Sequence, residues 1–291
     1  MKHKHKGALP ALLLAAAITA CGGSAAIPAQ SASAPTTTVP ATAQTPEAAA
    51  EKAFVTGQIL SGAEGDIRYS YELPAAYDEN DAYPMVVVMP GYDRMWFGEK
   101  SAGNNLDWNG VLAWTALDEE LIVVSAQLTD WGATSARQAN ELTGYFLENF
   151  AVDPTRVYAA GFSAGGETMS QAVALRPDLY AAYLHGSSQW DGAFAPVAEN
   201  QVAVYIFMAE NDEYYGSQRA RDAYDGLYTA YQSIGYSAGQ IDAVLQLEIP
   251  DNAYFNSRGI TNYHGGGSIL FNDEAILHWI LAHQKQEDPL R

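Results

Sequence analysis

Cysteine is almost missing from this sequence, because only Cys21 among the 291 residues carries a thiol. A chain with one cysteine cannot form an internal disulfide. Basic residues are also few, with 15 Lys and Arg against 34 Asp and Glu, which gives a formal net charge of −19. A surface of this sign makes nucleic acid and anionic lipid headgroups poor partners.

Motifs that bind metals and cofactors are missing as well. The sequence has no histidine pair at helical spacing, no calcium-loop pattern and no phosphate-cradling glycine loop followed by lysine. We therefore expect neither a metal nor a cofactor.

The N-terminus carries an apolar run that is too short to span a bilayer. This run, residues 7–20, follows Lys2, Lys4 and Lys6, which is the pattern of a signal peptide. It ends in Ile-Thr-Ala-Cys, which resembles a bacterial lipobox, where small residues precede a cysteine that is lipidated. The sequence thus predicts a protein lipid-anchored at Cys21 to the bacterial cell envelope, facing outside the cytoplasm. The alternative is an ordinary secretory signal that leaves Cys21 as a free thiol.

Composition divides the chain into three regions. A signal peptide occupies residues 1–20. Residues 21–52 form a linker of mainly Ala, Ser, Thr and Pro, with too few large apolar residues to fold. Residues 53–291 have the size of one α/β domain.

Apolar runs and helical periodicities alternate over residues 53–291. Several runs are unbroken, as in central strands covered on both faces. The alternation predicts a mostly parallel sheet with active-site residues at the carboxyl ends of its strands. The predicted strands are 54–60, 67–72, 85–89, 121–125, 157–161, 181–185, 202–208 and 245–249. The predicted helices are 111–119, 136–149, 167–175, 219–234 and 273–283.

The most informative motif is Gly-Phe-Ser-Ala-Gly at residues 161–165. The short apolar run 156–160 precedes it, and the helical segment 167–175 follows it. A strand, a tight turn and a helix in this order form a nucleophile elbow, which exposes the hydroxyl of Ser163. Side chains at the two glycine positions would collide with the neighbouring strand and helix. The alternative is a glycine-rich turn with an ordinary serine.

From about Pro84 to the C-terminus the sequence resembles an α/β-hydrolase. It resembles most the secreted esterases of the feruloyl-esterase and polyhydroxybutyrate-depolymerase type, and it is similar to the catalytic domain of prolyl-oligopeptidase-like serine peptidases. The resemblance implies an α/β-hydrolase fold, with a mostly parallel eight-stranded sheet and helices on both faces. It also implies a Ser-Asp-His triad in that chain order.

A serine nucleophile needs a base within hydrogen-bond reach, and the sequence has six histidines. Two lie in the signal peptide and two in the last predicted helix. His264 lies in a loop before three glycines, between the last predicted strand and helix, where the resemblance places the base. His185, inside a predicted strand, is the second candidate, although a buried structural imidazole is an alternative role for it.

The triad also needs a carboxylate that orients the imidazole. Asp212 follows the predicted strand 202–208 and matches the acid position of the resemblance. Glu210, Glu213 and Asp251 are other carboxylates in this part of the chain. Asp212 could instead cap the next helix.

The oxyanion hole requires two backbone N–H groups. Ala164, directly after the nucleophile, supplies one of them in an elbow. The second is expected from the loop after strand 85–89, which reads Pro90-Gly91-Tyr92 where most relatives have His-Gly. Proline has no N–H, so Tyr92 is the predicted donor.

Loops at the strand ends are predicted to line the substrate pocket with Gln189, Trp190, Trp96 and Tyr214. Other aromatic residues of these loops are Tyr92, Phe97, Trp108, Trp131 and Tyr215. Such a cluster fits the stacking of sugar rings or aromatic acyl groups.

Together these features predict an extracytoplasmic serine hydrolase that cleaves carboxylic esters, with acylated plant polysaccharide or small esters as substrates. A prolyl-oligopeptidase-like peptidase is the first alternative, because the same triad cleaves amides. A propeller or β-sandwich domain in front would favour the peptidase, and none is expected here. A catalytically silent lipoprotein that binds carbohydrate through its aromatic loops is the second alternative.

Overall fold

The computed structural model describes residues 53–98 and 105–285. The predicted signal peptide, the linker 21–52 and the lipidation site Cys21 lie outside the described residues.

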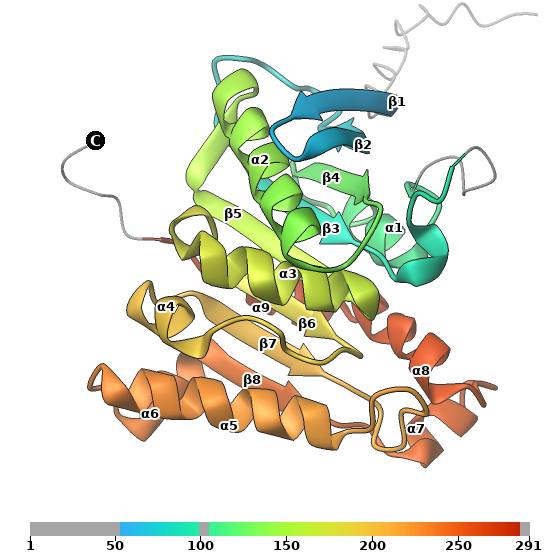
Figure 1. The fold of residues 1–291 in the computed structure, drawn as a ribbon, viewed down its shortest axis with the longest axis vertical. Helices are drawn as coiled ribbons and strands as arrows, with labels where there is room; N and C mark the ends of the chain where they lie inside the picture. The colour runs from blue at the N-terminus through green and yellow to red at the C-terminus, as the bar shows by residue number, and fades with distance from the viewer. Residues whose placement is uncertain (1–52, 99–104, 286–291) are drawn as a thin grey trace, which may run out of the picture. The chain divides into compact units, whose positions relative to one another are not determined.

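Eight strands form one sheet in the order β1-β2-β4-β3-β5-β6-β7-β8 (Figure 1). The pairs β1–β2 and β2–β4 are antiparallel, and the other five pairs are parallel. The strands are β1 (Ala53–Gly62), β2 (Gly65–Leu73), β3 (Tyr83–Met89), β4 (Ile122–Gln127), β5 (Val152–Phe162), β6 (Ala182–Gly186), β7 (Ala203–Phe207) and β8 (Leu245–Glu248). The predicted eight-stranded, mostly parallel sheet is confirmed.

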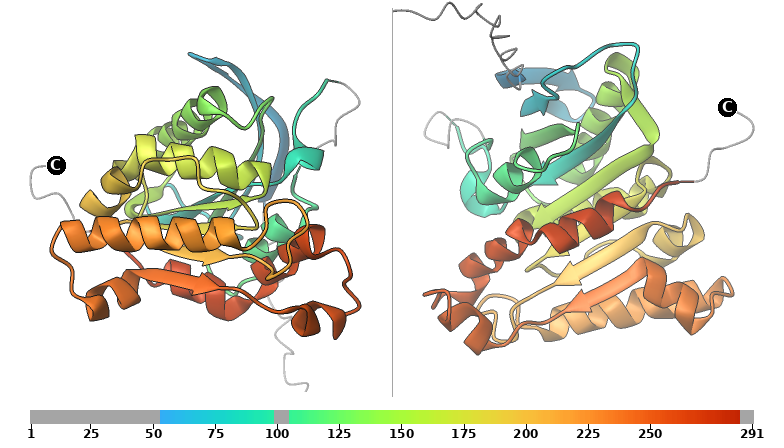
Figure 2. Two further views of the ribbon diagram at one scale, coloured as in Figure 1. Left: turned by 60° about the horizontal axis from the view of Figure 1, so that its bottom comes forward. Right: turned by 180° about the vertical axis from the view of Figure 1, so that it is seen from behind.

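Helices cover both faces of this sheet, as expected for parallel strands whose crossovers are helical. Helices α2, α3, α4 and α5 pack on one face, and α1 and α9 pack on the other (Figure 2). The helices are α1 (Asn109–Thr115), α2 (Ala133–Asn149), α3 (Ala164–Leu175), α4 (Phe194–Glu199), α5 (Gln218–Ser233), α6 (Ala238–Val244), α7 (Asn252–Asn256), α8 (Tyr263–Gly266) and α9 (Glu274–Leu281).

The central strands β3 and β4 show why the sheet is easily read from the sequence. Every residue of both strands is buried, and the runs Val86–Val88 and Ile122–Val124 are β-branched. β-Branched side chains favour extended backbone and pack well between two helical layers. An unbroken apolar run therefore marks each central strand.

The five predicted helices are present, and four shorter ones were not predicted. Helices α4, α6, α7 and α8 have between four and seven residues. Two turns or fewer are too short to show an apolar period. None of the described helices has both the length and the apolar character needed to cross a membrane.

Candidate active site

Ser163 lies at the sharp turn between β5 and α3, with φ 54° and ψ −125°. Non-glycine residues seldom adopt this conformation. A Cβ atom at Gly161 would lie 2.6 Å from the carbonyl oxygen of Gly165, and one at Gly165 would lie 2.1 Å from that of Met89. Both flanking positions therefore require glycine, and the turn has the geometry of a nucleophile elbow.

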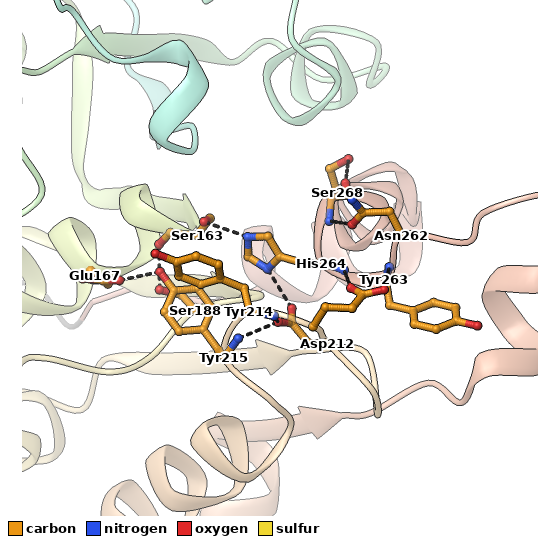
Figure 3. Close-up of polar contacts among 12 residues, drawn as sticks. Ser163, Glu167, Ser188, Asp212, Tyr214, Tyr215, Asn262, Tyr263, His264 and Ser268 are labelled. Atoms are coloured by element: carbon orange, nitrogen blue, oxygen red, sulfur yellow. Dashed lines mark hydrogen bonds and ion pairs between the residues drawn. The ribbon is translucent and has the colours of Figure 1, made fainter. Parts of the chain in front are cut away.

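Ser163, Asp212 and His264 come together at the carboxyl ends of β5, β7 and β8 (Figure 3). Ser163 Oγ lies 3.0 Å from His264 Nε2, and His264 Nδ1 lies 2.8 Å from Asp212 Oδ2. Because a carboxylate only accepts hydrogen bonds, Nδ1 of His264 carries a proton and donates a hydrogen bond to Asp212. Nε2 of the neutral ring then accepts from the serine hydroxyl. This chain of bonds can move the serine proton to His264.

Asp212 is buried and well supplied with donors. Its Oδ1 accepts the backbone N–H groups of Tyr214 and Tyr215, at 2.9 and 2.8 Å. Burial alone would raise the pKa of Asp212, but the hydrogen bonds from His264 and these N–H groups, with the attraction to His264, leave that pKa lowered. The alternative role as a helix cap is wrong, since Ser217 is the residue before α5.

His264 was expected in a loop and lies instead in the one-turn helix α8. The Asn262 side chain caps this turn by accepting the N–H of Gly265 at 2.7 Å. Glu213 accepts the N–H groups of Tyr263 and His264 through its two oxygens, at 2.9 and 2.7 Å. Glu213, a carboxylate next to the predicted acid, therefore fixes the backbone of the base.

The imidazole of His264 lies between two aromatic rings. The ring of Phe162 lies 5.6 Å away on centroids, at an interplanar angle of 26°, and that of Tyr214 lies 5.3 Å away at 30°. The two rings thus restrain the orientation of the imidazole.

His185, the second candidate base, is completely buried and occupied. Its Nδ1 lies 2.7 Å from the hydroxyl oxygen of Tyr183, and its Nε2–H donates to the carbonyl oxygen of Ser188 at 3.2 Å. Burial lowers the pKa of His185 to about 4, although the bond to Ser188 acts in the opposite direction. His185 is therefore a structural residue, and not a base for Ser163.

The triad opens into a cavity of about 570 Å³. It is lined by Gly91, Tyr92, Asp93, Trp108, Trp131, Phe162, Ser163, Ala164, Glu167, Tyr214, Tyr215, His264, Gly265 and Ser268. Six of these side chains are aromatic, and the two acidic ones are not matched by any lysine or arginine of the lining. The cavity suits a mainly apolar group placed next to the serine.

Both predicted oxyanion donors, Ala164 and Tyr92, line this cavity. Tyr92 begins a short 3-10 helix after Gly91, and Ala164 begins α3. In the described part of the chain, no acceptor is recorded for the N–H group of either residue. Both N–H groups are thus available to a developing negative charge.

Of the four predicted pocket residues, Tyr214 lines the cavity, whereas Gln189, Trp190 and Trp96 do not. The Trp190 indole donates to the carbonyl oxygen of Gly192 and packs on Phe194. The ring of Trp96 lies 3.9 Å below the guanidinium of Arg68. Gln189 contacts Glu167 without reaching the lining. The sequence places these residues on strand-end loops, but it does not show which way each side chain turns.

Glu167, which is not among the residues predicted from the sequence, is buried beside the nucleophile. Glu167 is 7% exposed and accepts a hydrogen bond from the Tyr215 hydroxyl through Oε1. No sequence pattern indicates this pair, because 48 residues separate its members. Among residues 53–98 and 105–285, no group of three His, Cys, Asp or Glu side chains could hold a metal ion.

Comparison with known proteins first gives a partial family match. The prolyl oligopeptidase family, peptidase S9, matches residues 125–234, which include Ser163 and Asp212 and end before His264. No curated protein sequence matches the chain.

Solved structures match over most of the chain. A thermostable esterase is 18% identical with a TM-score of 0.66, over 80% of this chain and 63% of that one. The chain has the α/β-hydrolase fold. The chain is also similar to a feruloyl esterase module from Clostridium thermocellum complexed with sinapinate, at 15% identity and TM-score 0.54, over 84% and 93% of the two chains.

Oligopeptidase B from Leishmania major is a third similar structure, at 11% identity and TM-score 0.51. The match covers 79% of this chain and 36% of that one. The chain therefore spans less than two thirds of both this structure and the thermostable esterase. The comparisons support a serine hydrolase, either an esterase or a peptidase.

Proposed function

We propose that the protein is an esterase that cleaves carboxylic esters through an acyl-enzyme on Ser163. The observation that carries this proposal is the continuous chain of hydrogen bonds from Asp212 through His264 to Ser163, which ends in a cavity. A serine at a strained turn, a base and a buried carboxylate in this order are the parts that acyl transfer needs.

In the first half-reaction, Ser163 Oγ attacks the ester carbonyl carbon while Nε2 of His264 takes the serine proton. Asp212 stabilises the resulting imidazolium, and the rings of Phe162 and Tyr214 lie against its faces. The carbonyl oxygen becomes negative and accepts the N–H groups of Ala164 and Tyr92. The bond to the alcohol then breaks, and His264 gives its proton to the leaving oxygen.

In the second half-reaction, His264 takes a proton from water, and the oxygen of that water attacks the acyl carbon. A second tetrahedral intermediate forms with its negative oxygen on the same two N–H groups. The bond between the acyl carbon and Ser163 Oγ breaks, His264 returns the proton to Oγ, and the acid is released.

Two observations bear on the substrate. The match to the feruloyl esterase module covers 84% of this chain and 93% of that one, and aromatic rings dominate the cavity lining. Both favour esters with an aromatic or other ring-shaped group, such as acyl groups on plant polysaccharide. The match to the prolyl oligopeptidase family favours a peptidase as the second candidate.

The proposed location is the outside of the bacterial cell envelope, through a lipid on Cys21. The lipobox-like sequence before Cys21, which is the one cysteine of the chain, supports this location. Replacing Cys21 by alanine should release the protein from the membrane fraction, and mass spectrometry of the wild type should find a diacylated N-terminal cysteine. A wild-type chain recovered without lipid would contradict this proposal.

Labelling of the full chain with a fluorophosphonate probe tests the esterase proposal. Wild type should be labelled, and Ser163→Ala and His264→Ala should not. His278→Ala, which changes an exposed histidine of α9, is the matched control and should label like wild type. A folded wild type that stays unlabelled would favour the silent binding protein.

Comparison of p-nitrophenyl acetate with aminoacyl p-nitroanilides then separates the two enzymes. Turnover of the ester alone supports the esterase, whereas faster turnover of an anilide supports the peptidase. Asp212→Asn should lower kcat by about 10⁴-fold, because the amide no longer holds the required imidazole tautomer.

A further inference from the structure

The site is built from two halves that both line the cavity. Ser163 and α3 form one half, and the segments after β7 and β8, with Asp212 and His264, form the other. Within the described residues, side-chain hydrogen bonds join the halves. One links Ser163 to His264, and another links the hydroxyl of Tyr215 to Glu167 (Figure 3). The hydroxyl of Tyr215 also contacts the side chain of Ser163.

The first of these bonds is lost in every catalytic cycle. Once Ser163 Oγ carries an acyl group, it has no proton to donate to His264. The base must nevertheless stay in place, because it has to activate the water that releases the acid. The bond from Tyr215 to Glu167 involves no reacting atom and persists through the acyl-enzyme.

Tyr215 is well placed to transmit this link to the triad. Its backbone N–H donates to Asp212 at 2.8 Å, and its ring lies 5.5 Å from that of His264 on centroids. Its hydroxyl bonds to Glu167, the fourth residue of α3. One residue therefore contacts the acid through its main chain, the base through its ring and the nucleophile helix through its hydroxyl.

The bond between these two residues is partly buried. Burial raises the pKa of Tyr215, and the bond to Glu167 raises it further, so the phenol remains a donor. Burial also raises the pKa of Glu167, although the hydrogen bond from Tyr215 opposes this rise. A hydrogen bond to a carboxylate in such surroundings is among the stronger ones in proteins.

We propose that Glu167 and Tyr215 form a positioning pair that holds Asp212 and His264 against α3 during deacylation. This inference rests on the proposed esterase function. It assigns the pair to one half-reaction, since the bond between Ser163 and His264 already aligns the free enzyme for acylation.

Tyr215→Phe tests the proposal, because it removes the hydroxyl and keeps both the ring and the backbone N–H. With p-nitrophenyl acetate, kcat should fall at least about tenfold and kcat/KM by less than about threefold, so KM falls as well. Slower deacylation should also produce a burst of one p-nitrophenol per enzyme. Glu167→Gln keeps an acceptor for the phenol, so the fold loss in kcat should be about a third of that in Tyr215→Phe.

Tyr205→Phe is the matched control. The Tyr205 hydroxyl donates to Glu248 at 2.7 Å, which is a second tyrosine–glutamate bond, made between β7 and β8 and away from the cavity lining. Its loss should leave kcat and the burst unchanged.

The possible outcomes are distinct. Equal losses in kcat and kcat/KM without a burst, or no loss beyond that of Tyr205→Phe, would overturn the positioning pair and leave the esterase intact. If Tyr215→Phe does not fold, the burst and kcat of Glu167→Gln decide the question. A folded wild type that neither labels nor turns over would remove the proposed function and this inference together.

Discussion

Gly166 and Ser188 are packed so closely that a Cβ atom at Gly166 would lie 2.4 Å from Cβ of Ser188. Ser188 in turn donates its hydroxyl to the carbonyl oxygen of Ser163 at 2.7 Å. The contact between these two residues thus holds the nucleophile turn from the side of β6.

Gly166→Ala should therefore displace Ser188 and destabilise the fold by about 1–3 kcal/mol, as overpacking typically does. Urea unfolding measures this change, and fluorophosphonate labelling should become slower. Gly144→Ala is the control, because a Cβ atom at this position of α2 meets nothing within 4 Å. It should be neutral or stabilise by up to about 1 kcal/mol. Similar behaviour of the two variants would contradict the close packing.

His185 should make stability depend on pH. The pKa of its imidazole is lowered from 6.5 to about 4 by burial, so between these values the unfolded chain binds a proton that the folded chain does not. The free energy of unfolding should consequently fall as the pH drops from 6.5 to 4, by about 3 kcal/mol for this group. Below pH 4 its contribution should level off.

The measurement compares the pH dependence of unfolding in wild type and His185→Gln, because other groups titrate in the same range. The difference in the free energy of unfolding between wild type and His185→Gln should narrow as the pH falls from 6.5 to 4. His278→Gln, at an exposed position, should keep the wild-type dependence. A constant difference between wild type and His185→Gln would show that His185 is not buried as a neutral ring.

Tyr92→Pro should remove the proposed second oxyanion donor without a change of fold. Tyr92 is the first residue of a 3-10 helix, a position where proline is tolerated. Gly91 is extended, with φ −71° and ψ −179°, which is the conformation required of a residue that precedes a proline. We expect kcat to fall by about 10²–10³, the usual cost of one lost donor. Tyr92→Ala keeps the N–H and should retain most of kcat. Equal losses in the two variants would place the donor elsewhere.

Trp131 and Trp96 offer a test of the pocket. Trp131 lines the cavity and contacts the ring of Tyr92 at 5.6 Å, whereas Trp96 stacks on Arg68 outside it. Trp131→Ala should raise KM for an aromatic ester by about 5-fold or more, in line with the loss of one aromatic contact. Trp96→Ala should leave KM unchanged. A rise in KM for Trp96→Ala and none for Trp131→Ala would support the pocket predicted from the sequence.

The sheet and the reacting residues could be predicted because their causes are local. An unbroken apolar run marks each central strand, and the elbow needs its two glycines whatever surrounds it. The family resemblance supplied the order in which Ser163, Asp212 and His264 occur. The distances between their side chains come from the structure alone.

The directions of loop side chains could not be predicted, because they depend on neighbours that are distant in sequence. Trp190 turns inward onto Phe194, and Trp96 turns toward Arg68. The bond between Tyr215 and Glu167 arises for the same reason, since β7 and β5 bring two separate segments to one edge of the sheet. Short elements such as α8 depend on side-chain caps and leave no period in the sequence.

The unusual backbone of Ser163 implies a conflict between catalysis and thermal resistance at one residue. Its φ of 54° and ψ of −125° suit glycine better than serine, and strain of this kind costs about 1–3 kcal/mol. A chain with glycine at position 163 would be inactive, yet it should melt at a higher temperature than wild type. The backbone is therefore strained at the residue that reacts, and greater heat tolerance has to be sought away from the elbow.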